Sequence, residues 1–363
     1  MEIEAFEHAA AGHDVERAER LIEGRGMPLH FRGALAPILH WLSSLPTTVL
    51  DARPGLWITY ASVLLGSGRT DVIEPKLQAA ERALRDAGRN DQTRDLLGRI
   101  ASTRATLAVS QLQVETIIAQ SRRALEYLDP DNLPFRTSAV FKLGFAHQLQ
   151  GDRAEARRAY DQALSMSRAS GNTMSEVLAS IGVGVSQETD NQLYLALETY
   201  RHVMELAAGL SQPVVCEAEL GLARVLYQWN DLDAAEEHGE RSLRLALQTG
   251  TDRPVVCEVF LARLALARGD GTRAGTLLAD ADRSARQHGY VLQMPEIAAA
   301  RVLALLRNSD VAAAAHVAGA RSATHTEAKV GSTRLTIGPA NRSGKATRSP
   351  HRGKRPAYAP PFQ

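Results

Sequence analysis

The segment LGFAHQLQGDRAEARRAYDQAL (Leu143–Leu164) decides the fold, because its pattern returns three times further along the chain. When the later segments are aligned with it, small residues recur in three columns at spacings of 37 to 41 residues. The columns are Gly144, Gly184, Gly221 and Ala262; Ala156, Ala196, Ala235 and Ala274; and Ala163, Val203, Ser242 and Ala281. A repeat of this length indicates an array of similar structural units rather than one globular core.

Each unit is predicted to be two amphipathic helices joined by a tight turn. Gly or Asn can end the first helix and Asp or Asn can cap the second, with Glu155 three residues after Asp152 as in a capping box. The turn pairs are Gly151-Asp152, Asp190-Asn191, Asn230-Asp231, Gly269-Asp270 and Ser309-Asp310. One hairpin cannot bury its apolar face alone. The sequence therefore predicts an all-α, right-handed superhelix of stacked antiparallel helix pairs, with tetratricopeptide-like units of about 37–41 residues.

The sequence PVVCE occurs at Pro213–Glu217 and again at Pro254–Glu258, after the loops GLSQ and GTDR. Both copies are expected to open the first helix of a unit, where proline is tolerated because its missing N–H would have no partner. Neighbouring helices pack roughly 8–10 Å apart, whereas the Cα atoms of a disulfide are about 4.4–6.8 Å apart. We therefore expect Cys216 and Cys257 to be two small buried thiols in equivalent positions.

Earlier units are visible but less regular. SRRALEYLD (121–129) and KLQAAERAL (76–84) match the second helix of a unit, and LWITYASVLLGSG (56–68) matches the first helix that precedes the latter. AAAGHDVERAERLIE (9–23) contains the Gly-x-Asp turn again. We therefore expect about seven to eight helix pairs to fill residues 1–322.

Composition is consistent with an all-α protein in the cytoplasm. Hydrophobic residues make up 44% of the chain but aromatics only 5%, and the bulk is helix-forming Ala, Leu, Arg and Glu. The start, MEIEAFEHAA, is too acidic and polar for a signal peptide, and no apolar run approaches the roughly 18 residues of a membrane span. Two cysteines fit a reducing compartment.

The net charge of +1 hides an acidic body and a basic tail. Residues 323–363 hold eight Lys or Arg and one acid, Glu327, so by subtraction residues 1–322 hold 34 basic and 40 acidic residues. The tail has almost no apolar period, and we expect it to be disordered. Its cations could hold nucleic acid non-specifically. The abrupt change near Arg321 instead favours a shifted reading frame or a truncated gene.

The repeat resembles two known patterns. The order Leu143, Gly144, Gly151, Ala156, Tyr160 and Ala163 resembles the tetratricopeptide motif, although the units exceed its usual length of about 34 residues. Several whole phrases are similar to the sensor region of MalT-like regulators in the LuxR class of bacterial transcription factors. The phrases are AGHDVERAERLIE (11–23), LHWLSSLPTTVLDARPGLWITYASVLLGSGRTD (39–71), RRALEYLDPDNLPFR (122–136) and LARVLYQWNDLDAAEEHGERSL (222–243).

This resemblance covers about residues 4–320 and implies a regulatory function. In the family, a nucleotide-binding ATPase domain precedes the superhelix and a helix-turn-helix domain follows it. The superhelix binds a small effector, maltotriose in the namesake, and is implied to control self-association. The present sequence starts where the superhelix starts and loses the family pattern near Arg321. The resemblance therefore predicts a sensor superhelix without its own ATPase and DNA-reading domains, which would not read a specific DNA sequence by itself.

The sequence contains no recognisable motif for catalysis, nucleotide binding or metal binding. The nearest match to a phosphate-binding loop, Gly338–Ala346, has one residue too many, ends in Ala and follows no strand. The eleven histidines form no His-x-x-x-His pair, and neither cysteine has a partner at zinc-ligand spacing. There is no Gly-x-Ser-x-Gly turn for a nucleophile. We expect neither an enzyme nor a cofactor or metal site.

The candidate ligand site centres on Tyr227 and Trp229, at the end of a first helix. Aromatic rings offer large contact area with little rotamer loss, so the two could flank a ligand in the concave groove; packing of an extended helix is the alternative. By repeat register, Gln148, Glu188 and Arg224 are the polar partners expected to face the same groove. The groove is expected to hold a small-molecule effector, or alternatively the helix or peptide of a partner protein bound by a stand-alone scaffold.

Overall fold

The computed structural model describes residues 2–24, 28–32, 34–67, 69–85, 88, 90–209, 215–248, 253–288, 290 and 293–324. All of them belong to one compact unit of the chain, Met1–Gly331. Several sequence predictions lie outside the described residues: Pro213, most of the GLSQ and GTDR loops, the Gly338–Ala346 segment and nearly all of the basic tail. The tail prediction therefore stays a prediction.

The described part of the chain consists of helices, and no strand occurs in it. The helices are α1 Glu2–Ala11, α2 Val15–Glu23, α3 Leu35–Ser44, α4 Thr47–Asp51, α5 Pro54–Gly66, α6 Ile73–Arg85, α7 Asp91–Gln111, α8 Val114–Tyr127, α9 Leu133–Gln150, α10 Arg153–Ser170, α11 Thr173–Thr189, α12 Leu193–Leu206, α13 Cys216–Gln228, α14 Leu232–Ala246, α15 Arg253–Arg268, α16 Gly271–His288, α17 Gln293–Arg307 and α18 Val311–Thr324. Three short 3-10 helices lie at Leu29–Arg32, Thr70–Val72 and Ala207–Gly209.

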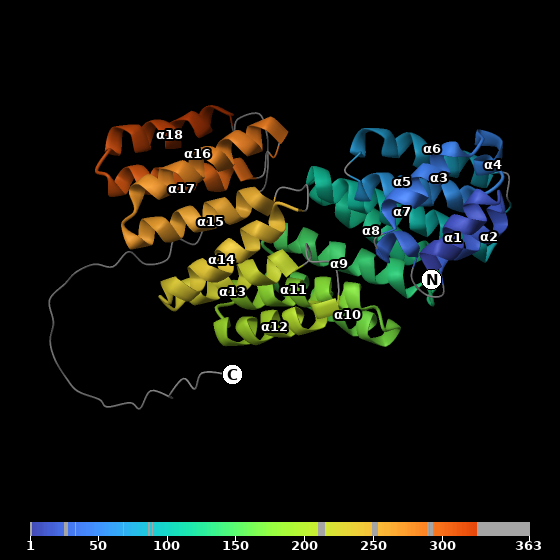
Figure 1. Cartoon of the computed structure of the whole chain (residues 1–363), viewed down its shortest axis with the longest axis horizontal. Helices are drawn as coiled ribbons and strands as arrows, with labels where there is room; N and C mark the ends of the chain where they lie inside the picture. Colours follow the sequence, from blue (N-terminus) through green and yellow to red (C-terminus); the bar gives the residue numbers. More distant parts are fainter. Residues whose placement is uncertain are drawn as a thin grey trace. The chain divides into compact units, whose positions relative to one another are not determined.

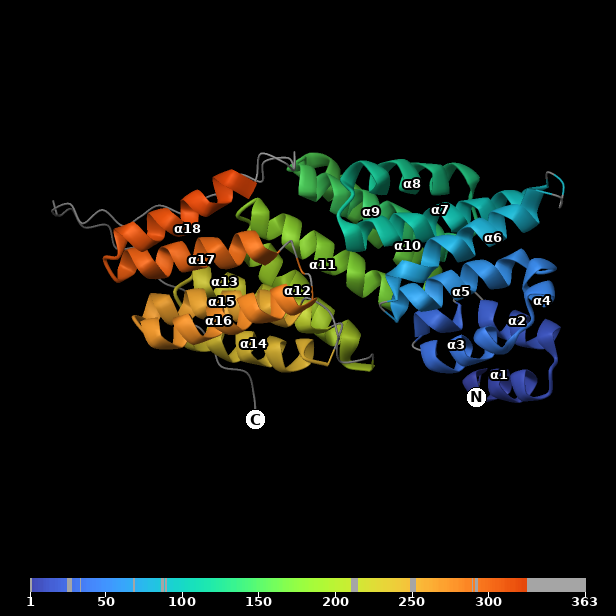
Figure 2. The ribbon, with the colours of Figure 1, turned by 90° about the horizontal axis from the view of Figure 1, so that it is seen from above.

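Consecutive helices pack as antiparallel pairs in chain order (Figures 1 and 2). Eight pairs are formed in the described residues, by α1 with α2, α5 with α6, and then each odd-numbered helix from α7 to α17 with its successor. Only α3 and the one-turn helix α4 depart from this scheme. The prediction of stacked helix pairs is therefore confirmed, and α18 runs to Thr324, two residues beyond the expected boundary of the body.

The turns within the pairs follow the predicted chemistry with two exceptions. Gly151 adopts a left-handed conformation (φ 78°), and the Asp152 side chain then accepts a hydrogen bond from the Glu155 N–H at 3.1 Å. The Glu155 side chain pairs with Arg158 and not with the backbone of Asp152, so the expected capping box is not completed. The second exception is the Asp190-Asn191 turn, where Gln192 occupies the cap position without a side-chain bond.

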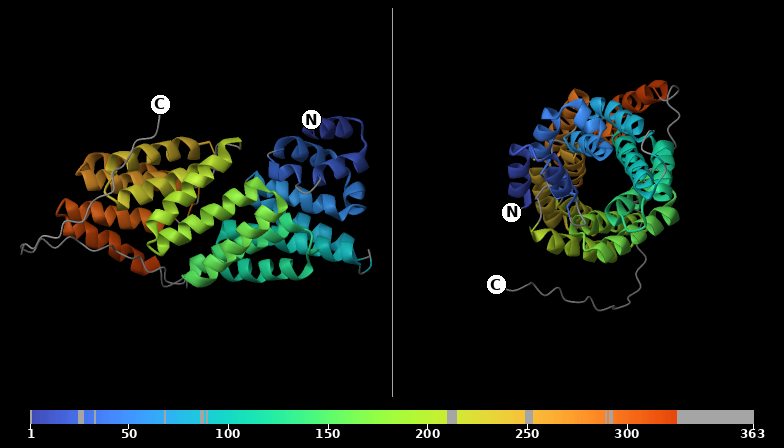
Figure 3. Two further views of the ribbon diagram at one scale, coloured as in Figure 1. Left: turned by 90° about the horizontal axis from the view of Figure 1, so that it is seen from below. Right: turned by 90° about the vertical axis from the view of Figure 1, so that its right-hand side faces the viewer.

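The first helix of each pair lies on the inner side of a right-handed superhelix. From α7 to α17, the first helix of each unit contacts the first helix of the next unit. The described second helices make no comparable contacts with one another. The first helices are therefore closer together, as on the inside of a curve. Seen from the α1 side, the ribbon turns clockwise as it recedes, which is right-handed (Figure 3, right). We call the layer of first helices the inner layer.

The three small-residue columns are buried where helices cross, as predicted. Tyr200 of α12 shows why the first column needs glycine. A Cβ atom on Gly184 of α11 would lie 2.6 Å from its ring, and one on Gly221 of α13 would lie 2.4 Å from it. Tyr160 of α10 lies in the same way between Gly144 of α9 and Gly182 of α11. In α10 and α12, a ring from the second helix thus fills the space that two neighbouring first helices leave open.

Candidate functional site

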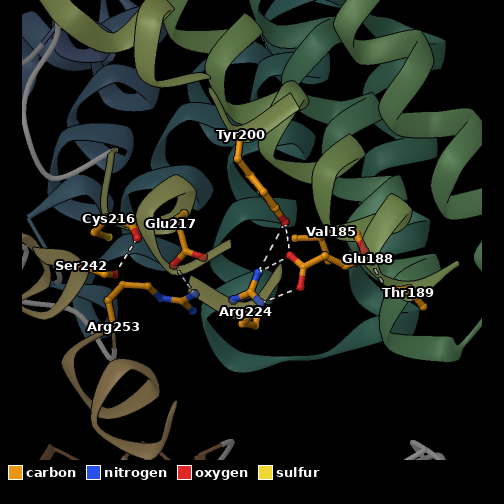
Figure 4. A network of polar contacts seen from close by, with 9 residues as sticks. All are labelled: Val185, Glu188, Thr189, Tyr200, Cys216, Glu217, Arg224, Ser242 and Arg253. Atoms are coloured by element: carbon orange, nitrogen blue, oxygen red, sulfur yellow. Dashed lines mark hydrogen bonds and ion pairs between the residues drawn. The ribbon is translucent and has the colours of Figure 1, made fainter. Parts of the chain in front are cut away.

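A cluster of polar side chains joins the first helices α11 and α13 through a tyrosine of α12 (Figure 4). The carboxylate of Glu188 accepts two hydrogen bonds from Arg224, whose Nε lies 2.8 Å from Oε2 and whose Nη2 lies 2.7 Å from Oε1. The hydroxyl of Tyr200 donates to the same carboxylate. Bidentate pairs of this kind are among the stronger charge-assisted hydrogen bonds. They hold one unit of the array against the next.

Arg224 and Tyr200 both keep their protons in this setting. Burial disfavours the charge on Arg224, but the neighbouring Glu188 carboxylate outweighs it, and the pKa of Arg224 is raised well above its ordinary value. Burial, with the Glu188 carboxylate adding to it, raises the pKa of Tyr200 well above its ordinary value, so the hydroxyl remains a donor. The side chains of Arg224 and Glu188 are 31% and 17% exposed, so solvent still reaches this pair.

A second ion pair continues the cluster into the next unit. Nη1 of Arg253, at the start of α15, lies 2.6 Å from Oε1 of Glu217, near the start of α13. The charge of Glu217 also acts on Arg224. Glu188, Arg224, Glu217 and Arg253 therefore form a row of alternating negative and positive charges across three successive first helices, which we call the charge row (Figure 4). The Glu217 and Arg253 side chains are 26% and 37% exposed.

Gln148 lies one unit earlier than the charge row. Its Oε1 accepts a hydrogen bond of 2.8 Å from the hydroxyl of Tyr160. It thus occupies in α9 the place that Glu188 occupies in α11, as the repeat register predicts. Among the described residues its hydrogen-bonding partner is that tyrosine, without the arginine that Glu188 has, so the structure does not bring Gln148 into the cluster with Arg224.

The two aromatic residues predicted for the site face different surroundings. Tyr227 packs its ring edge-on against Phe260 of α15, at a centroid distance of 6.0 Å, within a core cluster. Trp229 caps the end of α13 and is 45% exposed. Residues two apart on a helix project about 200° from each other. The structure therefore does not bring the two rings together: Tyr227 packs against Phe260, and Trp229 lies at the edge of the array, beside residues 191–195.

The arrangement of helices and polar residues agrees with a family assignment. Residues 98–333 match the family described as MalT-like TPR region. The chain belongs to this family. The match runs beyond Arg321, where the family pattern was expected to stop, and the repeats before residue 98 lie outside it. None of the helices in the described part of the chain is both long and apolar enough to cross a membrane.

Relatives of this MalT-like TPR region include the HTH-type transcriptional regulator MalT of Serratia proteamaculans (strain 568). The two are 26% identical over 270 residues, which are 74% of this chain and 30% of the relative. The chain thus spans about a third of the length of the curated relatives it matches. Among solved structures, the Rap protein complexed with Competence and Sporulation Factor has a TM-score of 0.62 at 13% identity, covering 89% of this chain and 86% of that one. NprR in complex with its cognate peptide NprX has a TM-score of 0.60 at 13% identity, covering 88% and 87%. At identities this low, the likeness shows that both structures share the fold of this chain and shows nothing about function.

Three members of the cluster in this MalT-like TPR region were missed from the sequence: Tyr200, Glu217 and Arg253. A regular signal was present. Arg253 follows Glu217 by 36 positions, as Arg224 follows Glu188. An acid in one first helix, followed one unit later by an arginine, therefore predicts a bridge between neighbouring units. A search for acid–arginine pairs 36 residues apart, one less than the shortest repeat spacing, would have found both pairs.

The two PVVCE thiols are free and buried, as predicted. The hydroxyl of Ser242 lies between them, donating to the Cys216 carbonyl at 2.7 Å and lying 3.2 Å from Sγ of Cys257. Burial raises the pKa of Cys216 to about 12 and that of Cys257 to about 11. Thiols so far from ionisation are poor nucleophiles, so their role is packing.

Proposed function

We propose that this MalT-like TPR region is the sensor of a regulator and that its effector binds on the inner layer at the charge row. The observation that carries the proposal is the pairing of partly exposed charges across α11, α13 and α15. Each pair joins two units, and each presents both a donor and an acceptor to a ligand. The effector is accordingly a polar molecule that exchanges hydrogen bonds with Arg224 and Glu188.

Effector binding at this place would act on the array as a whole. The two ion pairs set how closely α13 is held to α11 and to α15, and a ligand that replaces either partner favours a different spacing of these units. In a stacked array such a change passes to neighbouring units first. We propose that the resulting change of shape controls self-association. Gln148 extends the same polar positions one unit towards α9.

A ligand screen tests the proposal. Oligosaccharides, short peptides and common metabolites are added singly, and the unfolding temperature is recorded, because a ligand at a hundredfold excess over its Kd stabilises the folded state by about 2.7 kcal/mol. Each hit is then titrated against Arg224→Ala, with Arg268→Ala as the matched control. Arg268 is 34% exposed and paired with Asp233 and Glu236, away from the charge row. A tenfold or larger loss of affinity is expected in the first variant and none in the second; equal binding to both would place the effector elsewhere.

A charge exchange separates binding from stability. The double variant Glu188→Arg with Arg224→Glu keeps an ion pair between α11 and α13 but reverses its polarity. If the charge row only holds the units together, the variant behaves like the native protein in every assay. If the effector reads these charges, the variant melts within a few degrees of the native protein and no longer binds the hit.

A stand-alone scaffold that binds a partner's peptide or helix is the second candidate. What favours it is the fold shared with the Rap and NprR structures, both of which were solved with a peptide or factor bound. The screen distinguishes the two functions. Shifts confined to peptides, with none from saccharides or metabolites, would support the scaffold, whereas a saccharide or metabolite hit that depends on Arg224 would support the sensor.

A further inference from the structure

A second candidate surface lies away from the charge row, where the turn between α11 and α12 meets the turn between α13 and α14. The two turns border an open hollow of about 500 Å³. Its lining consists of Asn191, Gln192, Leu193, Tyr194, Leu195 and Trp229. Three of these side chains are large, apolar and unusually exposed: Tyr194 at 68%, Leu195 at 48% and Trp229 at 45%.

The repeat itself shows that these three residues are not required by the fold. In each of the five turn pairs named above, one residue adopts a left-handed conformation, and Trp229 directly precedes the one at Asn230. The other four turn pairs have a polar residue at the preceding position. These residues are Gln150, Asp190, Arg268 and Asn308. Tyr194 and Leu195 directly precede the buried alanine of the second column, and the other units have small or polar residues at these two places. These residues are Ala154 and Glu155, Asp233 and Ala234, Thr272 and Arg273, and Ala312 and Ala313.

Large apolar side chains are therefore placed where the array needs none, on the first turn of α12 and on the turn between α13 and α14, which border one hollow. Exposed aromatics are costly to keep in water, and a cluster of them on a soluble protein commonly marks a contact surface. Trp and Tyr are the residue types that contribute most to such contacts. Nothing comparable is required of a turn whose only task is to reverse the chain.

We propose that this hollow docks a short, uncharged apolar segment of a partner polypeptide. The chemistry of the lining specifies the occupant: none of the six side chains is charged, and Arg157, which contacts Gln192, is already paired with Asp190 and Asp161, so a charged segment would lose its hydration without gaining an unpaired counter-ion. The rings and Leu195 provide the apolar contact. The side-chain amides of Asn191 and Gln192 can exchange hydrogen bonds with the segment's backbone.

The size of the patch distinguishes this occupant from a second copy of the chain. Three partly exposed side chains offer a few hundred Å². A stable interface between two folded proteins buries more than about 1,000 Å² in total. A linear segment with two or three apolar residues needs no more area than the patch provides.

Peptide selection on the full chain tests the proposal. A phage library of random 12-residue peptides is first depleted on the double variant Tyr194→Ser with Trp229→Ser and then selected on the native protein. The enriched peptides are synthesised, and their Kd is measured by fluorescence anisotropy. We expect an uncharged core with at least one aliphatic or aromatic residue, and a loss of affinity of about tenfold or more in Trp229→Ser, typical of an interface aromatic.

Two controls define the site. Leu247→Ser removes another exposed apolar side chain, 65% exposed at the end of α14, and should leave the Kd unchanged. Arg224→Ala should also leave it unchanged, which separates this surface from the charge row. Selected peptides with charged cores, or peptides that bind Trp229→Ser as tightly as the native protein, would overturn the proposal. So would a failure to enrich any peptide combined with a dimer, seen by sedimentation velocity, that disappears in Trp229→Ser.

Discussion

At two successive contacts between units, bulky side chains pack against glycine, but the helices that supply them are exchanged. Around Tyr200, the ring belongs to a second helix and the glycines, Gly184 and Gly221, belong to the first helices on either side. One unit later the glycine is on the second helix, at Gly239 of α14, and the bulky side chains of Phe260 and Leu261 come from the first helix α15. The array thus keeps bulky side chains against glycine at both contacts, but exchanges the helices that supply them.

The exchange has a consequence for chemistry. A tyrosine on the second helix carries its hydroxyl to the inner layer, where Glu188 accepts from it and also from Arg224. With Gly239 in the tyrosine's register there is no hydroxyl, and Val225 occupies in α13 the register that Glu188 has in α11. Val225 is fully buried. The polar cluster therefore depends on which helix supplies the ring.

The largest effect is expected from removing the ring at each contact. Tyr200→Ala should lower the free energy of unfolding by about 3–5 kcal/mol, because a fully buried ring leaves a cavity and the Glu188 carboxylate loses a donor. Phe260→Ala should cost less, about 3 kcal/mol, since Leu261 lies against the same glycine and can partly refill the space. Urea unfolding measures both changes. A larger loss in Phe260→Ala would show that the two contacts are not equivalent in volume.

Removing only the hydroxyl tests the chemical difference between the two tyrosines. Tyr200→Phe loses a hydrogen bond to a carboxylate and should cost about 1.5–3 kcal/mol, whereas Tyr160→Phe loses a bond to the neutral amide of Gln148 and should cost about 0.5–1.5 kcal/mol. Each variant is the other's control, because the ring and its two glycines remain. Equal losses in urea unfolding would mean that Arg224 alone satisfies Glu188.

Adding one methyl group at each glycine compares how rigid the two contacts are. Gly221→Ala would place a Cβ 2.4 Å from the Tyr200 ring, which is held by its hydroxyl, and should cost about 1–2 kcal/mol. At Gly239 the nearest atom is a methyl of Leu261 at 2.9 Å, which can rotate, so Gly239→Ala should change stability by less than about 1 kcal/mol. Gly275→Ala, with no atom within 4 Å, controls for helix propensity and should stabilise. A greater loss at Gly239 than at Gly221 would contradict this order.

The regular part of this fold was predictable because packing imposes its pattern on the sequence. The small-residue columns, the turn pairs and the burial of both thiols follow from the need to bring helices close together and to end them, and these constraints recur in each unit. The irregular α3–α4 segment was not predictable, since it does not follow the repeat. The boundary near residue 322 rested on composition and on the loss of the family pattern near Arg321, and α18 crosses it by two residues.

The candidate site was predictable only in part. Register placed Glu188 and Arg224 correctly on successive first helices, and the structure pairs them. Register could not say which way Tyr227 and Trp229 point, because that depends on the packing of Phe260 from the next unit. The partner at a given position also changes between units. Gln148 and Glu188 share a register, but their contacts differ.

A pH-dependent effect is expected at Lys142, which occupies in α9 the register of Gly182 in α11. Its side chain is buried, and its Nζ donates to the carbonyl and the hydroxyl of Ser102 in α7, at 3.0 and 3.1 Å. Burial lowers the pKa of Lys142 to about 7 from an unfolded value of 10.5. Between these pH values the unfolded chain binds a proton that the folded chain lacks, so the free energy of unfolding should rise with pH, by at most about 1.4 kcal/mol per pH unit.

Lys142→Met should remove this rise. Urea unfolding at pH 7.5, 8.5 and 9.5 is compared between the native protein and the variant, and the difference between them should shrink or change sign as the pH increases, because the native protein gains stability and the variant does not. Lys76→Met is the control, since Nζ of Lys76 lies over the rings of Trp57 and Tyr60 and not in a buried polar contact. Parallel pH curves for the native protein and Lys142→Met would show that the amine stays protonated in the fold. The buried position of α9 that corresponds to Gly182 in α11 would then hold a charged ammonium group.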